Sequence, residues 1–263
     1  MDRSNPATTA ARPSGPRPPA LIVAIAPEPA AAFDTRADIL DAPLFPGERE
    51  TVRRAVASRC AEFTTGRACA RGALAGLGLA ACEIPTGPRG EPHWPRGVVG
   101  SIAHCDGYRG AVVGHTEQIV SIGIDAEPNR PLPDGVLEAV SLPEEANWVD
   151  RLLATAPEIR WDRLLFCTKE AVYKTWFPLT RSWLDFQDAM VTVDPVNERF
   201  TARLRVAGPA FQGRELIGFS GRFLVRDGLI LTSIVLVRRP RAVPSGMLLA
   251  RSSGAAAMAA DAL

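Results

Sequence analysis

The stretch FCTKEAVYK, residues 166–174, decides how this chain is interpreted. Apolar side chains in and around it recur with the spacing of a helix that is buried on one side. These apolar residues are Trp161, Leu164, Leu165, Val172, Trp176 and Phe177. Glu170 and Lys174 are four residues apart and therefore share one face of the predicted helix. Taken alone, such a pair is most often an ordinary ion pair on a solvated surface.

A second stretch, SIGIDAEP at residues 121–128, indicates that Glu170 and Lys174 belong to a functional site. Side chains alternate along a strand, so Asp125 and Glu127 face one way together with Gly123. The opposite face carries Ile122, Ile124 and Ala126. Two carboxylates on one strand, with Glu170 on a nearby helix, offer hard oxygen ligands that suit Mg²⁺. The pattern predicts that strand and helix meet around a metal ion, because surface ion pairs alone leave two acids on one face of an apolar strand unexplained.

Length and composition exclude several classes of protein. The 263 residues suffice for one large domain or two small ones, and the net charge of +1 gives no argument for nucleic acid or a membrane as partner. The five cysteines form no CxxC pair and are interpreted as reduced thiols. No segment reaches the roughly 20 apolar residues that span a bilayer. We expect a cytoplasmic protein.

The N-terminal part of the chain is expected to contain a strand, a long helix and a loop. Residues 1–19 and 239–263 have the composition of disordered tails. Residues 21–26 (LIVAIA) indicate a first strand, and a long helical region opens at Pro46 and ends at Gly78. A loop rich in proline and glycine follows at residues 85–96.

Strand-like runs dominate the remainder. Runs at 98–104, 110–114 and 119–126 predict an antiparallel meander, in which the first and third strands lie two places apart, roughly 10 Å. His104 ends the first run and Asp125 the third, so a ligand of nucleotide size would reach both. After a short helix near 143–149 and the helix with Glu170, four strands are expected. They lie at 190–194, 200–206, 216–225 and 229–237.

This order of elements predicts an α+β fold in two halves, residues 20–128 and 129–238, each a helix followed by antiparallel strands. Ligands commonly bind at such an interface between halves. Arg59 and Arg67 lie eight residues apart, about 80° around a continuous helix, so they can converge on one ligand. An arginine cluster of this kind more often coats a surface.

Three motifs carry a resemblance to a known family. GSIAHCDGY (100–108), SIGIDAEP (121–128) and FCTKEAVYK (166–174) resemble, in order and spacing, the motifs of the Sfp-type 4′-phosphopantetheinyl transferases. The sequences in and around these motifs are similar to those of the actinobacterial, mycobacterial-type branch. They are WPRGVVGSIAHCDGYRGAVVG, SLPEEANWV and LLFCTKEAVYKTWFPLTRSWLDF. The resemblance covers roughly residues 55 to 237. It implies a monomer with two similar halves related by pseudo-twofold symmetry, each a helix packed on an antiparallel sheet.

The resemblance also implies an activity. Members of this family bind coenzyme A and Mg²⁺, with Mn²⁺ as the alternative metal, between the two halves. They move the phosphopantetheine arm to a serine of apo acyl or peptidyl carrier proteins and release adenosine 3′,5′-bisphosphate. The carrier proteins belong to polyketide, nonribosomal peptide or fatty acid synthases, so secondary metabolism and siderophore biosynthesis are the expected settings.

The family roles carry over to named residues. Asp125, Glu127 and Glu170 correspond to the metal ligands, Glu170 also to the base for the serine, and Lys174 to the lysine that steadies the pyrophosphate. The residues expected to bind coenzyme A are Arg59, Arg67, Arg89, Ser101, His104, Lys169 and Lys174. Of these, Arg59, Arg67 and His104 match positions that hold its 3′-phosphate and adenine end. One departure is Thr86, which stands where the mycobacterial-type branch has a phosphate-binding lysine. Arg89, three residues on, is the expected substitute, with a different geometry toward phosphate.

Two other functions remain open from the residues. A Mg²⁺-dependent phosphoesterase acting on holo carrier proteins would use the same carboxylates but needs no coenzyme A pocket, so Arg59, Arg67 and His104 favour transfer. A module that binds coenzyme A or carrier proteins without catalysis would be favoured if a carboxylate or the lysine were missing. The apolar residues Trp176, Phe177 and Leu179 are expected either to contact a carrier protein or to lie in the core.

Overall fold

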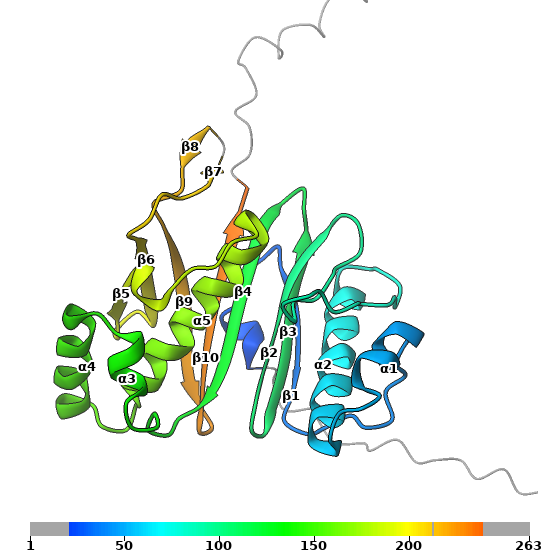
Figure 1. Cartoon of the computed structure of the whole chain (residues 1–263), viewed down its shortest axis with the longest axis horizontal. Helices are drawn as coiled ribbons and strands as arrows, with labels where there is room; N and C mark the ends of the chain where they lie inside the picture. The colour runs from blue at the N-terminus through cyan, green and yellow to red at the C-terminus, as the bar shows by residue number, and fades with distance from the viewer. Residues whose placement is uncertain (1–20, 212, 239–263) are drawn as a thin grey trace, which may run out of the picture.

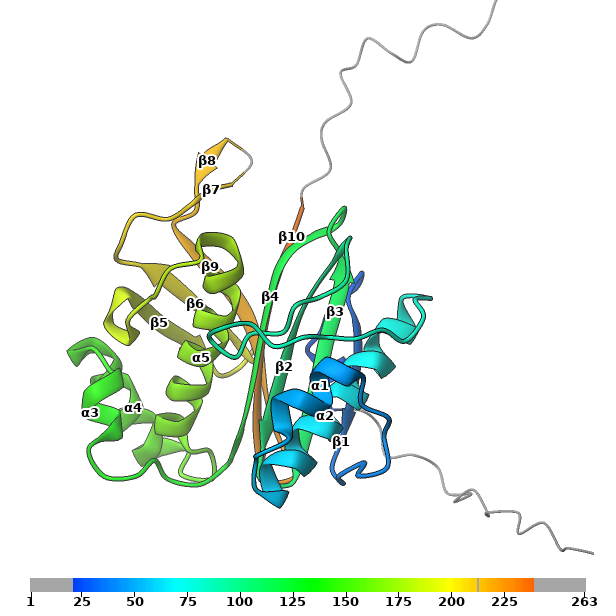
Figure 2. The same ribbon diagram turned by 45° about the vertical axis from the view of Figure 1, so that its right-hand side comes forward.

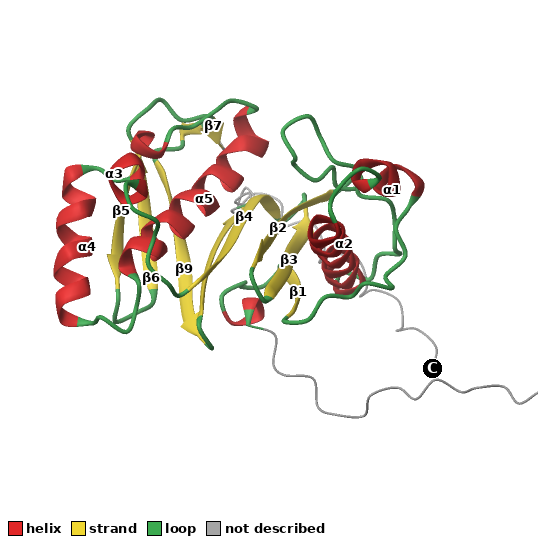
Figure 3. Ribbon diagram, turned by 60° about the horizontal axis from the view of Figure 1, so that its bottom comes forward, coloured by secondary structure: helices red, strands yellow, loops and turns green. Residues whose placement is uncertain are grey.

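The computed structural model describes residues 21–211 and 213–238. Two antiparallel sheets form its centre, one of three strands in the order β1-β3-β2 and one of five in the order β4-β10-β9-β6-β5. Helix α2 covers the three-stranded sheet and α5 the five-stranded one (Figures 1 and 3). The expected α+β fold, with helices packed on antiparallel sheets, is confirmed. The tails expected at 1–19 and 239–263 lie outside the described residues.

The elements have the following bounds. The first sheet contains β1 (Ala31–Thr35), β2 (Val98–Cys105) and β3 (Tyr108–His115), with α1 (Pro46–Val52) and α2 (Ala57–Gly76) beside it. The second contains β4 (Ile119–Pro128), β5 (Ala189–Asp194), β6 (Arg199–Leu204), β9 (Gly218–Arg226) and β10 (Leu229–Val237). Its helices are α3 (Val136–Val140), α4 (Pro143–Thr155) and α5 (Trp161–Thr180). Short elements are η1 (Ile22–Ala24), η2 (Phe186–Asp188), β7 (Ala210–Phe211) and β8 (Arg214–Glu215). None of the described helices is long and apolar enough to cross a bilayer.

Strand β4 follows the predicted alternation. Ile122, Ile124 and Ala126 are buried in a core that also takes side chains from β2, β3, β9 and β10. Asp125 and Glu127 point to the opposite side, where a lysine and an arginine of α5 bind them. The prediction that the strand presents its two acids to the helix is therefore confirmed.

The predicted first strand at residues 21–26 is wrong. The segment forms the turn η1, in which Ala26 donates its backbone N–H to the carbonyl oxygen of Ile22 (2.9 Å). Ile22 and Ile25 are buried in the core between the sheets, whereas Val23 is exposed. Burial three residues apart belongs to a helical turn rather than a strand. The N-terminal strand is instead β1, which we did not predict from the sequence.

The long helical region from Pro46 to Gly78 is divided. Helix α1 ends at Val52, and α2 begins after Val56, whose backbone is extended (φ −67°, ψ 157°). The cause lies in Glu48, which is fully buried and accepts a hydrogen bond of 3.0 Å from Arg71 of α2. In one continuous helix these two residues would lie about 34 Å apart. The chain has to fold back on itself for this ion pair to form.

The predicted meander is half wrong. Strands β2 and β3 pair as expected, but β4 leaves that sheet and pairs with β10 from Pro128 to Ile119. Strands β2 and β4 nevertheless lie side by side (Figure 1), and the N–H of Ile124 donates to Ser101 Oγ at 3.1 Å. Local spacing revealed each strand. The choice of partner depended on β10, about a hundred residues further along the chain.

Helix α5 approaches β4 very closely at Gly123. A Cβ atom at this position would overlap with the carbonyl oxygen of Ala171 and the hydroxyl group of Thr175, both on α5. The contact is reinforced beside it, where Ser121 donates its hydroxyl hydrogen to the carbonyl oxygen of Thr175 (2.7 Å). A glycine in strand β4 therefore fixes the distance between strand and helix.

Lys169 belongs to the core of the second half. Its ammonium donates to the carbonyl oxygens of Phe186 (2.6 Å) and Ala189 (3.0 Å) and lies 2.7 Å from Glu145 Oε2. Glu145 is fully buried and also accepts the N–H of Val191 at 2.6 Å. This ion pair ties α4, α5 and β5 together. Because Glu145 already neutralises the charge of Lys169, its expected role in binding coenzyme A stays a prediction.

We expect Gly123→Ala to lower the free energy of unfolding by about 2–3 kcal/mol, because the added methyl group forces α5 away from β4. Gly66→Ala is the matched control: its Cβ would meet only Ile102, at an ordinary 3.5 Å, and it should stabilise helix α2 by about 0.5–1 kcal/mol. Urea unfolding measures both. A change at Gly123 within about 0.5 kcal/mol would contradict the close approach.

Glu145→Ala should destabilise the protein by about 3–5 kcal/mol, because it leaves the buried ammonium of Lys169 without a counter-charge. The control is Glu50→Ala, which breaks an exposed pair with Arg53 (3.0 Å) and should change stability by less than about 1 kcal/mol. Equal effects of the two substitutions in denaturant unfolding would show that the buried pair adds nothing.

Candidate functional site

An ion pair between α5 and β4 lies at the centre of the site. Lys174 Nζ donates to Asp125 Oδ1 at 2.6 Å, and Asp125 is only 5% exposed. Burial by itself would lower the pKa of Lys174, but the carboxylates of Asp125 and Glu170 outweigh it and raise this pKa. Lys174 therefore remains a cation at neutral pH.

The second carboxylate oxygen of Asp125 differs from the first in its hydrogen bonding. Oδ2 is buried and accepts no hydrogen bond from a nitrogen or oxygen donor in the described part of the chain. The neighbouring Glu127 accepts a hydrogen bond of 3.0 Å from Arg163 Nη1 on α5. Burial raises the pKa of Glu127, and the charge of Asp125 raises it further. Burial likewise raises the pKa of Glu170, again with a contribution from Asp125.

These observations test whether a divalent cation fits. Within residues 21–211 and 213–238, no three His, Cys, Asp or Glu side chains are grouped tightly enough to hold a metal ion as they stand. The donors themselves do fit: Asp125 has a buried oxygen that no nitrogen or oxygen donor of the described residues contacts, and the negative charges of the carboxylates repel one another. Mg²⁺ prefers such oxygen ligands and would relieve that repulsion.

A cavity of about 860 Å³ opens beside this centre. Its wall is formed by α1, α2, the loop at 85–96, β2, β4 and α5. Seven of the residues that the sequence singled out line it: Arg59, Arg67, Arg89, Ser101, His104, Glu170 and Lys174. Asp125 and Glu127 lie behind Lys174 and Arg163, and Lys169 is directed away from the cavity. The structure thus brings together residues separated by more than a hundred positions.

Arg67 is the most firmly held cation of the cavity wall. Its Nε donates to the carbonyl oxygen of Ile84 and its Nη2 to Thr86 Oγ1, each at 2.9 Å. Its guanidinium also lies 4.3 Å from the ring centroid of Phe63. Burial lowers the pKa of Arg67 to about 10, which still leaves it charged. Thr86, the position that departs from the family pattern, therefore orients an arginine.

Arg59 and His104 are joined by a residue that the sequence analysis missed. Glu62 accepts a hydrogen bond of 2.9 Å from Arg59 Nη1, and its other oxygen lies 3.4 Å from His104 Nδ1. Burial lowers the pKa of His104, although the charge of Glu62 opposes this. Glu62 follows Arg59 by three residues on α2, so helical spacing was the signal that would have revealed it.

Ser101 and Arg89 occupy different kinds of position. Ser101 is buried, and its hydroxyl oxygen accepts the N–H of Ile124, so it joins β2 to β4. Arg89 lies on the loop, with its guanidinium carbon 5.7 Å from the ring centroid of Phe177 on α5. The loop therefore reaches across the cavity to the second half of the molecule.

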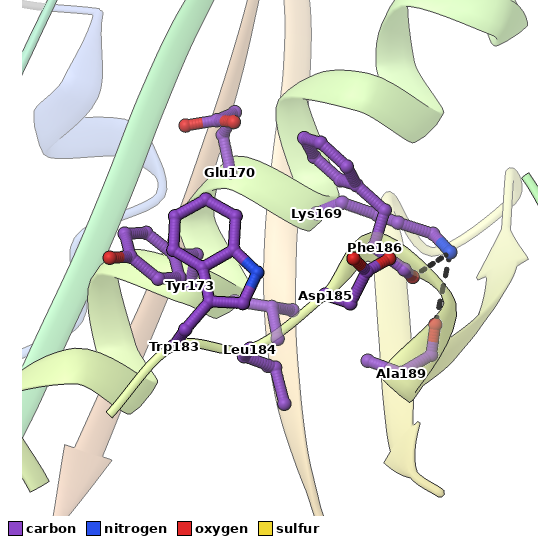
Figure 4. Close-up of a pocket in the computed structure, with 9 residues that line it drawn as sticks. Lys169, Glu170, Tyr173, Trp183, Leu184, Asp185, Phe186 and Ala189 are labelled. Carbon is purple, nitrogen blue, oxygen red and sulfur yellow. Dashed lines mark hydrogen bonds between the residues drawn. The ribbon is translucent and has the colours of Figure 1, made fainter. Parts of the chain in front are cut away.

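A second, narrow cavity of about 140 Å³ adjoins the first. Figure 4 shows Tyr173 and Trp183 on one side of it and Phe186 and Lys169 on the other. Glu170 and Tyr173 line both cavities. The ring centroids of Tyr173 and Trp183 are 5.0 Å apart, which gives the narrow cavity an aromatic wall.

Of the apolar residues considered for carrier contact, Trp176 and Phe177 are buried and Leu179 packs against the core. Trp176 and Leu179 therefore lie in the core, whereas Phe177 also lines the large cavity. The exposed aromatic side chain of this region is Trp183, at 60% exposure. Arg163, which binds Glu127, lies seven residues before Glu170 and thus on the same face of α5, a spacing that would have identified it.

Two family models match the chain. Residues 47–114 match the N-terminal domain of 4′-phosphopantetheinyl transferases, and residues 121–215 match the 4′-phosphopantetheinyl transferase superfamily. The matches cover the two helix-and-sheet parts that line the large cavity. They agree with the resemblance that the three sequence motifs indicated.

Curated relatives give the same result. The 4′-phosphopantetheinyl transferase Svp of Streptomyces mobaraensis is 49% identical over 229 residues, which is 86% of this chain and 91% of the relative. PptT of Mycobacterium tuberculosis is 49% identical over 195 residues (73% and 85%), and Npt of Nocardia iowensis 48% over 197 residues (72% and 87%). All three are named transferases, so the phosphoesterase and the non-catalytic module gain no support among them. The chain belongs to the 4′-phosphopantetheinyl transferase superfamily and is an enzyme of that kind.

Proposed function

We propose that the donor is coenzyme A, that the acceptor is a serine of an apo acyl or peptidyl carrier protein, and that Mg²⁺ or Mn²⁺ is the metal. The observation that carries this proposal is the position of Glu170 on the border of two unlike cavities. Coenzyme A also has two unlike parts, an anionic nucleotide and a thin neutral arm. They join at the pyrophosphate, where the transfer breaks a bond. A molecule occupying both cavities has that bond beside Glu170.

The large cavity suits the nucleotide part. Its volume of about 860 Å³ is that of a small-molecule site, and Arg59, Arg67, Arg89 and His104 line its wall. Arginine donates in a planar fork that matches phosphate oxygens. The narrow cavity suits the arm because Tyr173, Trp183 and other aromatic or aliphatic side chains form its wall.

Asp125, Glu127 and Glu170 are the residues that would hold the metal ion. When bound, Mg²⁺ neutralises charge on the transferring phosphate, which is the main requirement of phosphoryl-type transfer. Asp125 is placed for this by Lys174, and Glu127 by Arg163. The division into residues 20–128 and 129–238 remains part of this proposal, with the ligands between the two halves.

The proton and the leaving group are handled by two residues of α5. The serine oxygen forms a bond to phosphorus while the bond to adenosine 3′,5′-bisphosphate breaks, and the serine proton passes to Glu170, directly or through water. A metal ion held by Glu170 lowers the basicity of its carboxylate, and a water molecule that relays the proton removes this conflict with its role as base. Lys174, whose raised pKa keeps it charged, stabilises the negative charge on the departing bisphosphate.

The wider setting belongs to the same proposal. We infer that the enzyme acts as a monomer in the cytoplasm, where its five cysteines stay reduced; none of them forms a disulfide within the described residues. Its carrier proteins would be those of polyketide, nonribosomal peptide or fatty acid synthases, including siderophore biosynthesis. Neither nucleic acid nor a membrane is an expected partner.

We expect Glu170→Ala to reduce the turnover number at least about a hundredfold, because a positioned base contributes that much to proton transfer. Release of adenosine 3′,5′-bisphosphate, followed by chromatography with an apo carrier protein, measures it. Glu144→Ala, an exposed position of α4, is the control and should be fully active. A Glu170→Ala enzyme that keeps its fold and works within about tenfold of wild type would contradict the assigned role.

A further inference from the structure

Helix α5 places two cations against the two acids of strand β4. Lys174 donates to Asp125 at 2.6 Å, and Arg163 donates to Glu127 at 3.0 Å. Figure 2 shows α5 lying beside β4, with the loop at residues 85–96 reaching across the strand toward the helix. The carboxylates of the strand that would hold a metal ion are thus already paired with side chains of the protein itself.

The two cations differ in how firmly they are held. Arg163 makes two further hydrogen bonds, from Nε to the carbonyl oxygen of Arg130 (3.1 Å) and from Nη2 to that of Pro131 (2.6 Å). Lys174 has one hydrogen-bond acceptor within the described residues, namely Asp125. Its side chain is 30% exposed and lines the large cavity, whereas that of Arg163 is 14% exposed and does not. Because lysine also has a flexible stem and three rotatable donors, Lys174 is the cation that can move.

The ammonium of Lys174 lies between the cavity and Asp125. Asp125 is buried and does not line the cavity, and the ammonium contacts its Oδ1. The other oxygen, Oδ2, is buried without a nitrogen or oxygen donor among the described residues. A divalent cation that enters from the cavity therefore meets a positive charge at the carboxylate that it has to reach. Like charges a few ångströms apart repel strongly where water is largely excluded, so Lys174 in this position opposes metal binding.

We propose that Lys174 is an internal counter-ion with two positions: on Asp125 in the free protein, and on the pyrophosphate of coenzyme A when that ligand is bound, which opens Asp125 to the metal ion. This inference rests on the proposed function. The resemblance implies the second position, whereas the first position and its effect on the metal follow from the ion pair. Glu170 and Lys174 share one face of α5 and both line the cavity, so an anion beside Glu170 lies within reach of the ammonium.

The two positions make binding of the metal ion and of coenzyme A cooperative. When the ammonium moves to the anion, the positive charge leaves Asp125, and by linkage each ligand strengthens binding of the other to the same degree. Phosphate oxygens also bind divalent cations, so cooperativity alone does not identify the role of Lys174. The metal affinity of the protein without coenzyme A does identify it. A lysine that only contacts phosphate leaves this affinity unchanged, whereas a counter-ion on Asp125 weakens it.

The test is calorimetric titration of the full chain, stripped of metal with EDTA and dialysed, with Mn²⁺ in the absence of coenzyme A. Lys174→Met removes the charge and should bind Mn²⁺ at least about fivefold more tightly than wild type, the lower end of common coupling between sites. Lys174→Arg keeps the charge and should bind Mn²⁺ as weakly as wild type. The control is Arg53→Ala, an exposed arginine outside the cavity, paired with Glu50, that should leave the affinity unchanged.

Thermal unfolding in Mn²⁺ and in EDTA accompanies the titration, because Lys174→Met leaves the buried carboxylate of Asp125 without a counter-charge. A ligand of the folded state raises the unfolding temperature, so Mn²⁺ should raise that of Lys174→Met more than that of wild type. This larger shift supports the proposal even where the metal-free variant is too unstable to titrate.

Two results would overturn the proposal. One is a Lys174→Met protein that binds Mn²⁺ no more tightly than wild type and shows no larger thermal shift. The other is equal tightening of Mn²⁺ binding by Lys174→Arg and Lys174→Met, since the charge would then have no effect. If wild type binds neither coenzyme A nor, in its presence, Mn²⁺, the proposed function falls too. If wild type binds both, either result in the Lys174 variants refutes this inference alone.

Discussion

The site depends on how closely α5 packs on β4. Gly123 is the position that permits it, because any side chain there would overlap with the backbone of Ala171 and with Thr175. At this distance Lys174 reaches Asp125 from the helix to the neighbouring strand, with 2.6 Å between their polar atoms. A wider spacing would separate the lysine from the buried carboxylate and leave that charge uncompensated, which proteins rarely tolerate.

This packing also divides the charges of the site into two groups. Acidic groups gather where β4 faces α5, with Arg163 and Lys174 as their partners. Basic groups line the large cavity, contributed by α2, the loop at 85–96 and the end of α5, with Glu62 and Glu91 paired among them. Glu170 stands between them, and burial raises its pKa. A ligand that is anionic at one end and neutral at the other fits this distribution, and so does a cation held by the acids.

Local periodicity predicted the parts of the site that depend on one element. The alternation of β4 identified Asp125 and Glu127, and helical spacing placed Glu170 and Lys174 on one face. Periodicity did not predict the features that depend on contacts between residues distant in sequence. The buried pair of Glu48 and Arg71 divides the long helix, and β10 draws β4 away from the first sheet.

Side chains of residues adjacent in sequence point in different directions from a helix. Lys169 precedes Glu170 by one residue, which rotates it about 100° away from the cavity and toward Glu145. Membership of the motif therefore did not show which of its side chains line the large cavity.

Metal-dependent transfer can be tested by intact-mass spectrometry of an apo carrier protein incubated with this protein, coenzyme A and Mg²⁺. We expect a mass increase of one phosphopantetheine arm that EDTA abolishes. An unchanged mass with several carrier proteins, while the protein still binds coenzyme A, would contradict it.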